Sequence, residues 1–177
     1  GKYIFTLPQG AMVSDFVIWE DGVRIPGVIV ERKRARQIYE ELTSMKIDPG
    51  LMETTSIDNR NTFSVEIYPI PANATKRVEI EYTQEISVDS LSSNFTFPLK
   101  PNLYGSQSCD IFDLSLEVSS SFPMKDFKLT SATYPITFSR NKNNEQAGEF
   151  SQRKISFTED FSFEYKIDSP ENSFSVV

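Results

Sequence analysis

The sequence predicts a mainly β protein, built of antiparallel, sandwich-like sheets with one α-helix at about residues 31–44. Three observations support this class. Apolar and polar residues alternate in most segments of the 177-residue chain, which is typical of half-buried antiparallel strands. Aromatic residues are frequent, with 14 Phe and 7 Tyr, and they favour strands over helices. Apolar residues follow a helical spacing in one stretch, which predicts the single helix.

The first twenty residues are expected to form a β-hairpin. Alternation over Tyr3–Leu7 predicts the first strand, and a Pro-Gln-Gly turn separates it from a second apolar run at Asp15–Trp19. A Glu-Asp-Gly turn then leads into a third strand, Val23–Val30. Pro26 interrupts this strand, which indicates a bend or an edge position.

The helix is predicted over Glu31–Thr43. Its apolar residues recur at positions i, i+3, i+4 and i+7 and form one face, which consists of Ala35, Ile38, Tyr39 and Leu42. Charged residues occupy the other faces, and Arg36 and Glu40 have the i, i+4 spacing at which opposite charges attract. The string Asp48-Pro49-Gly50 then ends any helix and turns the chain.

Further strands are predicted on both sides of a polar linker at Ser87–Asn94. In the first half, Phe63–Ile67 and Val78–Tyr82 alternate. The strands expected in the second half are Phe95–Leu99, Phe112–Val118, Phe127–Thr130, Ile136–Ser139, Lys154–Phe157 and Phe161–Ile167. The segment Arg140–Gly148 is too polar to bury and is expected to be a hairpin loop or an exposed segment.

Composition argues against several classes of function. The net charge is 18 − 25 = −7, and nucleic-acid binding requires an excess of Lys and Arg to neutralise phosphates. The chain has no His, which excludes Ser-His-Asp and Cys-His catalysis as well as His-ligated metals. Its one cysteine, Cys109, cannot form an internal disulfide, and the adjacent Asp is expected to raise the thiol pKa. No stretch is apolar enough for a membrane helix, so we expect no direct membrane insertion. The sequence also contains no glycine-rich phosphate-binding loop, so we expect no cofactor.

Paired carboxylates are the remaining candidates for chemistry. Glu79 and Glu81 are two residues apart on one predicted strand and therefore share a face, with Glu66 expected on the same side of the sheet. They adjoin Arg77 and fit a solvated sheet face better than the acid pair of a glycosidase. The string at residues 58–61, Asp-Asn-Arg-Asn, fits a turn better than a calcium loop, so no metal site is expected.

Seven segments of the first half follow one another in an order and spacing that is specific in combination. They are Phe5–Trp19, Glu20–Gly27, Glu31–Glu40, Asp48–Glu53, Phe63, Tyr68–Ala72 and Arg77–Thr83. Together they resemble the VIT domain, which is named for vault protein and inter-alpha-trypsin inhibitor. The resemblance implies a non-catalytic module of a multidomain protein. Such proteins include secreted inhibitor heavy chains, a vault-associated ADP-ribosyltransferase and bacterial envelope proteins.

The resemblance divides the chain into a VIT domain at residues 1–86 and a second β-rich half at residues 87–177. The second half is expected either to pack on the first or to form a separate β-sandwich subdomain, and it is similar to the stretch that precedes a von Willebrand A domain in the family. The family's domain begins one or two strands earlier. An N-terminal edge strand is therefore expected to be missing, which would leave the backbone of Tyr3–Leu7 free to pair with another chain.

The residues that match the family motif are expected to be structural. They are Trp19, Asp21, Gly22, Ala35, Ile38, Tyr39, Asp48, Pro49, Gly50, Pro69, Pro71 and Tyr82. Within this set, Ala35, Ile38 and Tyr39 would dock the helix on the sheet. No catalytic residue, cofactor or metal ligand is implied by the resemblance.

Three functions are compatible with these observations. The leading one is a structural and protein-interaction module that supports a neighbouring von Willebrand A domain in a secreted or cell-envelope protein. The second is a carbohydrate-type ligand-binding β-sandwich, in which Trp19 would be a stacking platform. If Trp19 were buried in the core, this second hypothesis would fail. The third is a hydrolase, which needs a carboxylate of raised pKa in a cleft.

Overall fold

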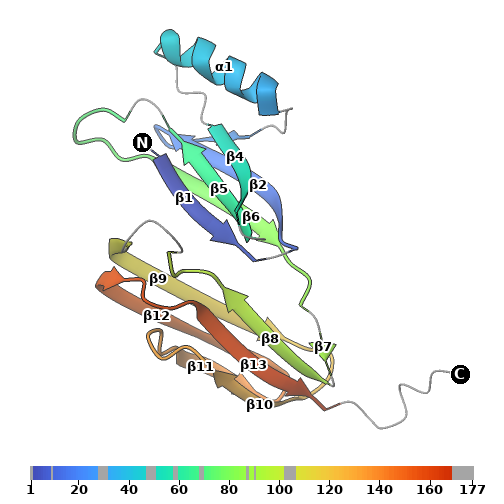
Figure 1. The fold of residues 1–177 in the computed structure, drawn as a ribbon. Coiled ribbons are helices and arrows are strands. Elements are labelled where there is room, and N and C mark those ends of the chain that lie inside the picture. The colour runs from blue at the N-terminus through green and yellow to red at the C-terminus, as the bar shows by residue number, and fades with distance from the viewer. Residues whose placement is uncertain are drawn as a thin grey trace, which may run out of the picture. The chain divides into compact units, whose positions relative to one another are not determined.

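The computed structural model describes residues 2–8, 10–27, 32–46, 51–57, 60–67, 70–86, 88–89, 91–101 and 107–168. Within these ranges the chain forms thirteen strands, all paired antiparallel, and one helix (Figure 1). The predicted fold class, mainly β with antiparallel sheets and a single helix, is confirmed. The chain divides into two compact units, Gly1–Glu85 and Ile86–Val177.

The first unit contains two three-stranded sheets and the helix. Its elements are β1 (Lys2–Leu7), β2 (Met12–Glu20), β3 (Val23–Pro26), α1 (Arg32–Ser44), β4 (Leu51–Ile57), β5 (Arg60–Glu66) and β6 (Arg77–Thr83). One sheet has the strand order β1-β5-β4 and the other has the order β3-β2-β6. Residues of both sheets contribute to the same apolar clusters, so the two sheets enclose a shared core.

The predicted N-terminal hairpin is wrong, although both of its strands exist. β1 pairs with β5, whereas β2 pairs with β3 and β6, so the two strands belong to different sheets. Between them the amide of Ala11 donates to the carbonyl oxygen of Pro8 at 3.1 Å, which closes a turn. Leu7 and Ala11, before and within this connection, are both buried. The connection therefore carries the chain around the core from one sheet to the other.

A β-bulge in β2 sets which side chains face the core. Val13 is opposite Tyr82 and Asp15 is opposite Glu81, so one extra residue, Ser14, lies in β2. Such an insertion reverses the alternation of faces. Val13 lies on the core side before the bulge, and Phe16 and Ile18 lie on the core side after it.

The helix agrees with its prediction to within a residue at each end but is only half-buried. Ala35, Ile38, Tyr39 and Leu42 each retain partial exposure, and none belongs to a buried cluster. The helix contacts β4.

The predicted pairing of Arg36 with Glu40 is wrong. The Arg36 guanidinium instead forms an ion pair with Glu53 of β4 and another, at 3.3 Å, with Glu66 of β5. Partial burial opposes the charge of Arg36, but these carboxylates outweigh that effect and raise its pKa. Carboxylates on the sheet thus hold the helix from outside the helical sequence.

The second unit contains a four-stranded and a three-stranded sheet. Its strands are β7 (Val88–Asp89), β8 (Ser92–Phe97), β9 (Ser108–Ser119), β10 (Met124–Leu129), β11 (Thr137–Lys142), β12 (Glu145–Ser156) and β13 (Phe161–Ile167). The strand orders are β10-β13-β8-β7 and β11-β12-β9. One core lies between the two sheets, and residues of β9, β12 and β13 meet in it.

Two segments predicted to be irregular are partly strand. The expected linker Ser87–Asn94 contains β7 and the start of β8. Its residues are mostly small and polar, but Ser93 is buried and pairs with Tyr165 of β13. The expected loop Arg140–Gly148 is indeed part of a hairpin, but β11 and β12 extend through most of it. Within it Gln146 is only 5% exposed, and its Nε2 donates to the carbonyl oxygen of Lys142. That hydrogen bond offsets the cost of burying an amide side chain.

Within the part of the chain that the structure describes, no helix has the length and apolar character needed to cross a membrane.

Candidate interaction surface

One sheet of the first unit carries a group of polar and aromatic side chains on its outer face. These residues are Ser14, Asp15, Trp19, Arg24, Arg77, Glu79 and Glu81, and we call this group the Trp19 face. It exists because residues that are directly opposite in antiparallel strands share a side of the sheet. Trp19 lies between Arg24 on β3 and Arg77 on β6, on the face of the sheet opposite Phe16 and Ile18, and this face also carries the fully buried Val17.

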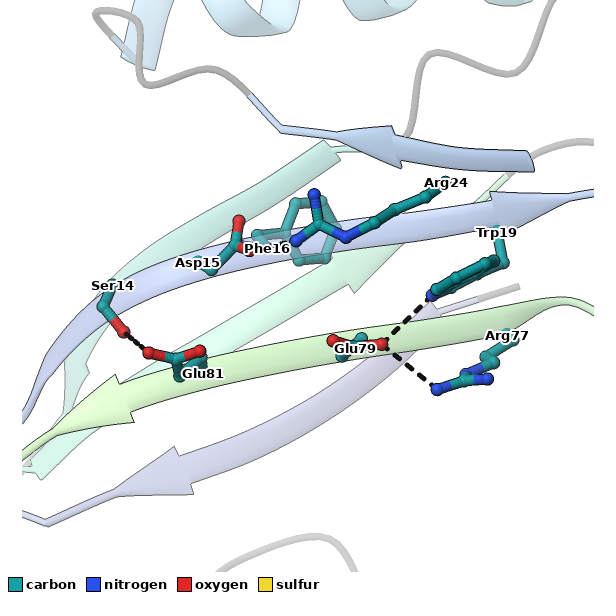
Figure 2. Close-up of polar contacts among 8 residues, drawn as sticks. All are labelled: Ser14, Asp15, Phe16, Trp19, Arg24, Arg77, Glu79 and Glu81. Carbon is teal, nitrogen blue, oxygen red and sulfur yellow. Dashed lines mark hydrogen bonds and ion pairs between the residues drawn. The ribbon is translucent and has the colours of Figure 1, made fainter. Parts of the chain in front are cut away.

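The indole of Trp19 is held by two neighbours on β6. Its Nε1 donates to Oε2 of Glu79 at 3.1 Å, and the guanidinium of Arg77 donates to the same oxygen at 3.2 Å (Figure 2). The Arg77 guanidinium carbon lies 4.7 Å from the centre of the indole ring, which is a cation–π distance. Trp19 is therefore partly exposed and ordered, and it is not a core residue.

The rest of the Trp19 face carries two carboxylates, Asp15 and Glu81, and one guanidinium, Arg24. Arg24 forms an ion pair with Asp15, and the hydroxyl of Ser14 donates to Glu81 at 3.0 Å. Ion pairs this exposed contribute little to stability. They do leave a surface of mixed sign with an aromatic side chain at one end, which suits a protein partner better than a phosphate or a membrane.

Asp21 and Gly22 form the two-residue turn between β2 and β3. Their φ angles are +49° and +79°, which is the left-handed conformation that a type I′ hairpin turn requires at both positions. Beside this hairpin, Nζ of Lys76 binds Oε1 of Glu20 at 2.6 Å. The turn fixes the register in which Trp19 faces Arg24.

The other motif residues are divided among separate places. Ala35, Ile38 and Tyr39 are half-buried on α1. Pro71 is exposed, and its carbonyl oxygen accepts a hydrogen bond from the amide of Ala74. Tyr82 packs beside the buried cluster of Leu7, Ala11 and Phe63, and burial raises its pKa. The motif residues that lie outside the described residues are Asp48, Pro49, Gly50 and Pro69.

The carboxylates considered as a catalytic pair do not converge. Glu79 and Glu81 are exposed on β6, whereas Glu66 lies on β5 in the other sheet and binds Arg36. The expectation that Glu66 shares their side is therefore wrong. In the described residues no three His, Cys, Asp or Glu side chains gather in a way that could hold a metal ion. Asp58 and Asn59 of the predicted turn lie outside these residues, but Ile57 pairs directly with Arg60 on either side of them.

Cys109 lies on β9 and is half-buried. Burial raises the pKa of its thiol, and the charge of Asp110 raises it further. The sequence identified the direction of this shift but not its larger cause.

Sequence reasoning missed Arg24 and Arg77 as neighbours of Trp19. Alternation along the strand places Arg77 on the same face as Glu79, so part of this arrangement could have been predicted from the sequence. Which residues lie opposite Trp19 depends on strand register, and a single sequence does not give it.

The family model described as the Vault protein inter-alpha-trypsin domain matches residues 1–82. Residues 1–82 are a VIT domain. The whole Trp19 face lies inside this VIT domain, since it runs from Ser14 to Glu81.

Two curated relatives match over 97 residues, or 55% of this chain. The protein mono-ADP-ribosyltransferase PARP4 of Mus musculus is 34% identical, and that of Homo sapiens is 32% identical. The chain spans only 5% and 6% of the lengths of these relatives.

Proposed function

We propose that this chain is a non-catalytic structural and protein–protein interaction module of a longer multidomain protein, in which it supports a neighbouring von Willebrand A domain. One observation carries the proposal. A VIT domain occupies residues 1–82, and the relatives that match this chain contain the matched stretch as a small fraction of much longer proteins. The partners would then be other domains of the same polypeptide.

The Trp19 face is the contact surface that fits this role best. Trp and Arg are enriched at the energetic centres of protein interfaces. Here Trp19 is already fixed by Glu79 and Arg77, so little side-chain freedom is lost on binding. The Trp19 face carries two cations and three carboxylates, so its burial against a partner would leave only a small net charge.

The proposal assigns no catalysis to this chain. The relatives are named as transferases, and the matched stretch is about one-twentieth of their length. We place that activity in other parts of those chains. We also propose that the longer protein is secreted or located in the cell envelope. This part of the proposal rests only on the location of other proteins with VIT domains.

A binding titration tests the proposal. The chain is titrated with the segment that follows it in the parent protein, and saturable binding is expected. Trp19→Ala should weaken binding by a factor of about ten or more, as for interface tryptophans in general. Ser14→Ala, which removes only a hydroxyl of the same face, is the matched control and should change affinity by less than about twofold. Binding that is absent, or unaffected by Trp19→Ala, would contradict the proposal.

Carbohydrate binding remains a second candidate because Trp19 is partly exposed and not in the core. Arg77 covers one face of its ring, so a sugar could stack only on the other. A glycan-array screen of the chain and of Trp19→Ala separates the two functions. Glycan binding that disappears in the variant would favour this second function over the first.

A further inference from the structure

We propose that strand β9 is a docking edge for an extended, basic segment of a protein partner, which adds as a new strand to the β11-β12-β9 sheet. This surface lies in the second unit and shares no residue with the Trp19 face. The proposal rests on the position of β9 in its sheet and on its charges.

β9 is long and is paired on one side only. It contains 12 residues, and its register with β12 runs from Ser108 to Ser119. At about 3.4 Å per residue this edge is roughly 40 Å long. The strand order places β9 at the end of its sheet, and within the described ranges no strand pairs with its other side. Its outward amide and carbonyl groups are therefore a template for a further strand.

The charges of β9 specify the partner. The strand carries three acidic residues, Asp110, Asp113 and Glu117, and no basic ones. Among the described residues, Asp110 and Asp113 form no ion pair within 4.0 Å. Glu117 has one long contact, at 3.6 Å to Arg140, and its side chain is 77% exposed. Asp113 and Glu117 alternate with the core residues of β9, so both lie on the exposed face of the sheet, where Asp113 accepts a hydrogen bond from the hydroxyl of Ser151 at 2.6 Å.

These charges distinguish two possible occupants. A second copy of β9 would bring carboxylates opposite carboxylates, and like charges in directly paired positions are destabilising. A strand with Lys or Arg at alternate positions would place cations opposite Asp113 and Glu117. Ile111, 60% exposed, adds an apolar contact for such a strand. The edge is therefore complementary to a basic, extended segment and not to itself.

The test uses the whole chain and a defined probe. The probe is a fluorescein-labelled ten-residue peptide of alternating Lys and Val, and fluorescence anisotropy reports its binding. A second probe has the same sequence with every other backbone nitrogen methylated, which keeps the charge but removes half of the amide donors. We expect the first probe to bind and the second to bind about tenfold more weakly or not at all.

Matched variants locate the binding. Asp113→Lys should weaken binding by about fivefold or more, because it replaces attraction with repulsion at the edge. Glu149→Lys makes the same change in net charge on β12, opposite Ser115 and away from the edge, and should have a much smaller effect. Asp113→Asn serves in place of Asp113→Lys if circular dichroism shows that the latter is unfolded.

Each other outcome overturns the proposal. Equal binding of the two probes would indicate charge attraction without strand pairing. Equal weakening by Asp113→Lys and Glu149→Lys would place the peptide on the sheet face and not on its edge. Absence of binding would mean that the acidic residues only protect the edge, and self-association detected by sedimentation velocity would identify a second copy as the occupant.

Discussion

Among the glycines that the structure describes, Gly148 is the one at which an added methyl group would meet the shortest contacts. A Cβ built there lies 2.5 Å from Cγ2 of Ile136 and 2.6 Å from the carbonyl oxygen of Thr137. Both distances are shorter than real contacts, and the second atom belongs to the backbone. Gly148 faces the register shift of β11 between Phe138 and Arg140, where the two strands approach closely.

Gly148→Ala should therefore destabilise the second unit by about 1–3 kcal/mol, the usual cost of overpacking. Urea unfolding followed by circular dichroism measures the change. Glu149→Ala removes an exposed side chain from the next position and should stay within about 0.5 kcal/mol of the parent chain. Equal stability of the two variants would show that the strands can separate to admit a methyl group.

Tyr134 couples the stability of the second unit to alkaline pH. Its side chain is fully buried, and its hydroxyl donates to the carbonyl oxygen of Glu159 at 2.7 Å. Burial, aided by the charges of Glu159 and Asp160, raises the pKa of the phenol to about 12. In the unfolded chain a tyrosine titrates near pH 10.

Between about pH 10 and pH 12 the unfolded chain thus loses this proton while the folded chain keeps it, so stability falls as pH rises. This contribution is fully present below pH 10. The urea midpoint should fall further between pH 9 and pH 11.5 in the parent chain than in Tyr134→Phe, because the variant has no phenolic proton to lose at this position. At pH 8 the variant should be less stable by about 1 kcal/mol, because it lacks the hydrogen bond. Parallel pH profiles of the two proteins would remove Tyr134 as the cause.

At the scale of residues, the sequence predicts local backbone conformation better than it predicts burial or contacts between side chains. It identified the turn residues Asp21 and Gly22, because positive φ is a local property. It did not predict that Gln146 is buried or that Arg77 covers Trp19. Both depend on which residue lies opposite in a neighbouring strand, and register is set by the assembled sheets.

At the scale of elements, substitutions in α1 test how firmly this helix is docked on its sheet. Ile38→Asp places a carboxylate on the half-buried face and should destabilise the first unit by about 2 kcal/mol or more. Gln37→Asp adds the same charge one residue earlier, on the exposed face, and should cost less than about 1 kcal/mol. Thermal unfolding of both variants measures the difference. Similar melting temperatures would mean that the helix face is misassigned.

Element types were predictable where the periodicity was strong. The helix and β13 were found within a residue of their ends, since both have a clear pattern of apolar spacing. β4 was missed because Leu51–Ile57 contains mostly Met, Glu, Thr and Ser, and it is a strand through its pairing with β5. The hairpin of β1 and β2 was wrong because a short turn between two strands is equally compatible with pairing and with a change of sheet.

At the scale of the whole molecule, we predict that the two units fold independently. Each has its own core and its own two sheets. A fragment of residues 86–177 should give an amide NMR spectrum that superimposes on the corresponding signals of the whole chain. Limited proteolysis should cut first between β6 and β8, at the boundary between the two units. An unfolded fragment would show that the second half depends on the first.

The family was predictable from the sequence, whereas the candidate surface was not. The VIT domain is identified by short sequence strings in a fixed order, and these can be recognised without knowledge of the fold. The Trp19 face unites residues of β2, β3 and β6, far apart in the chain, and it becomes visible only once the sheets are paired.

The change of sheet between β1 and β2 also governs when the first unit can form during synthesis. Lys2 pairs with Glu66, and Met12 pairs with Thr83. Neither sheet can close until its C-terminal strand has left the ribosome, and contacts this distant in sequence form slowly. The nascent chain therefore carries β1 and β2 without their long-range partners through most of the translation of the VIT domain. We therefore expect the β1-β5-β4 sheet to close only after β5 emerges and the β3-β2-β6 sheet only after β6 emerges.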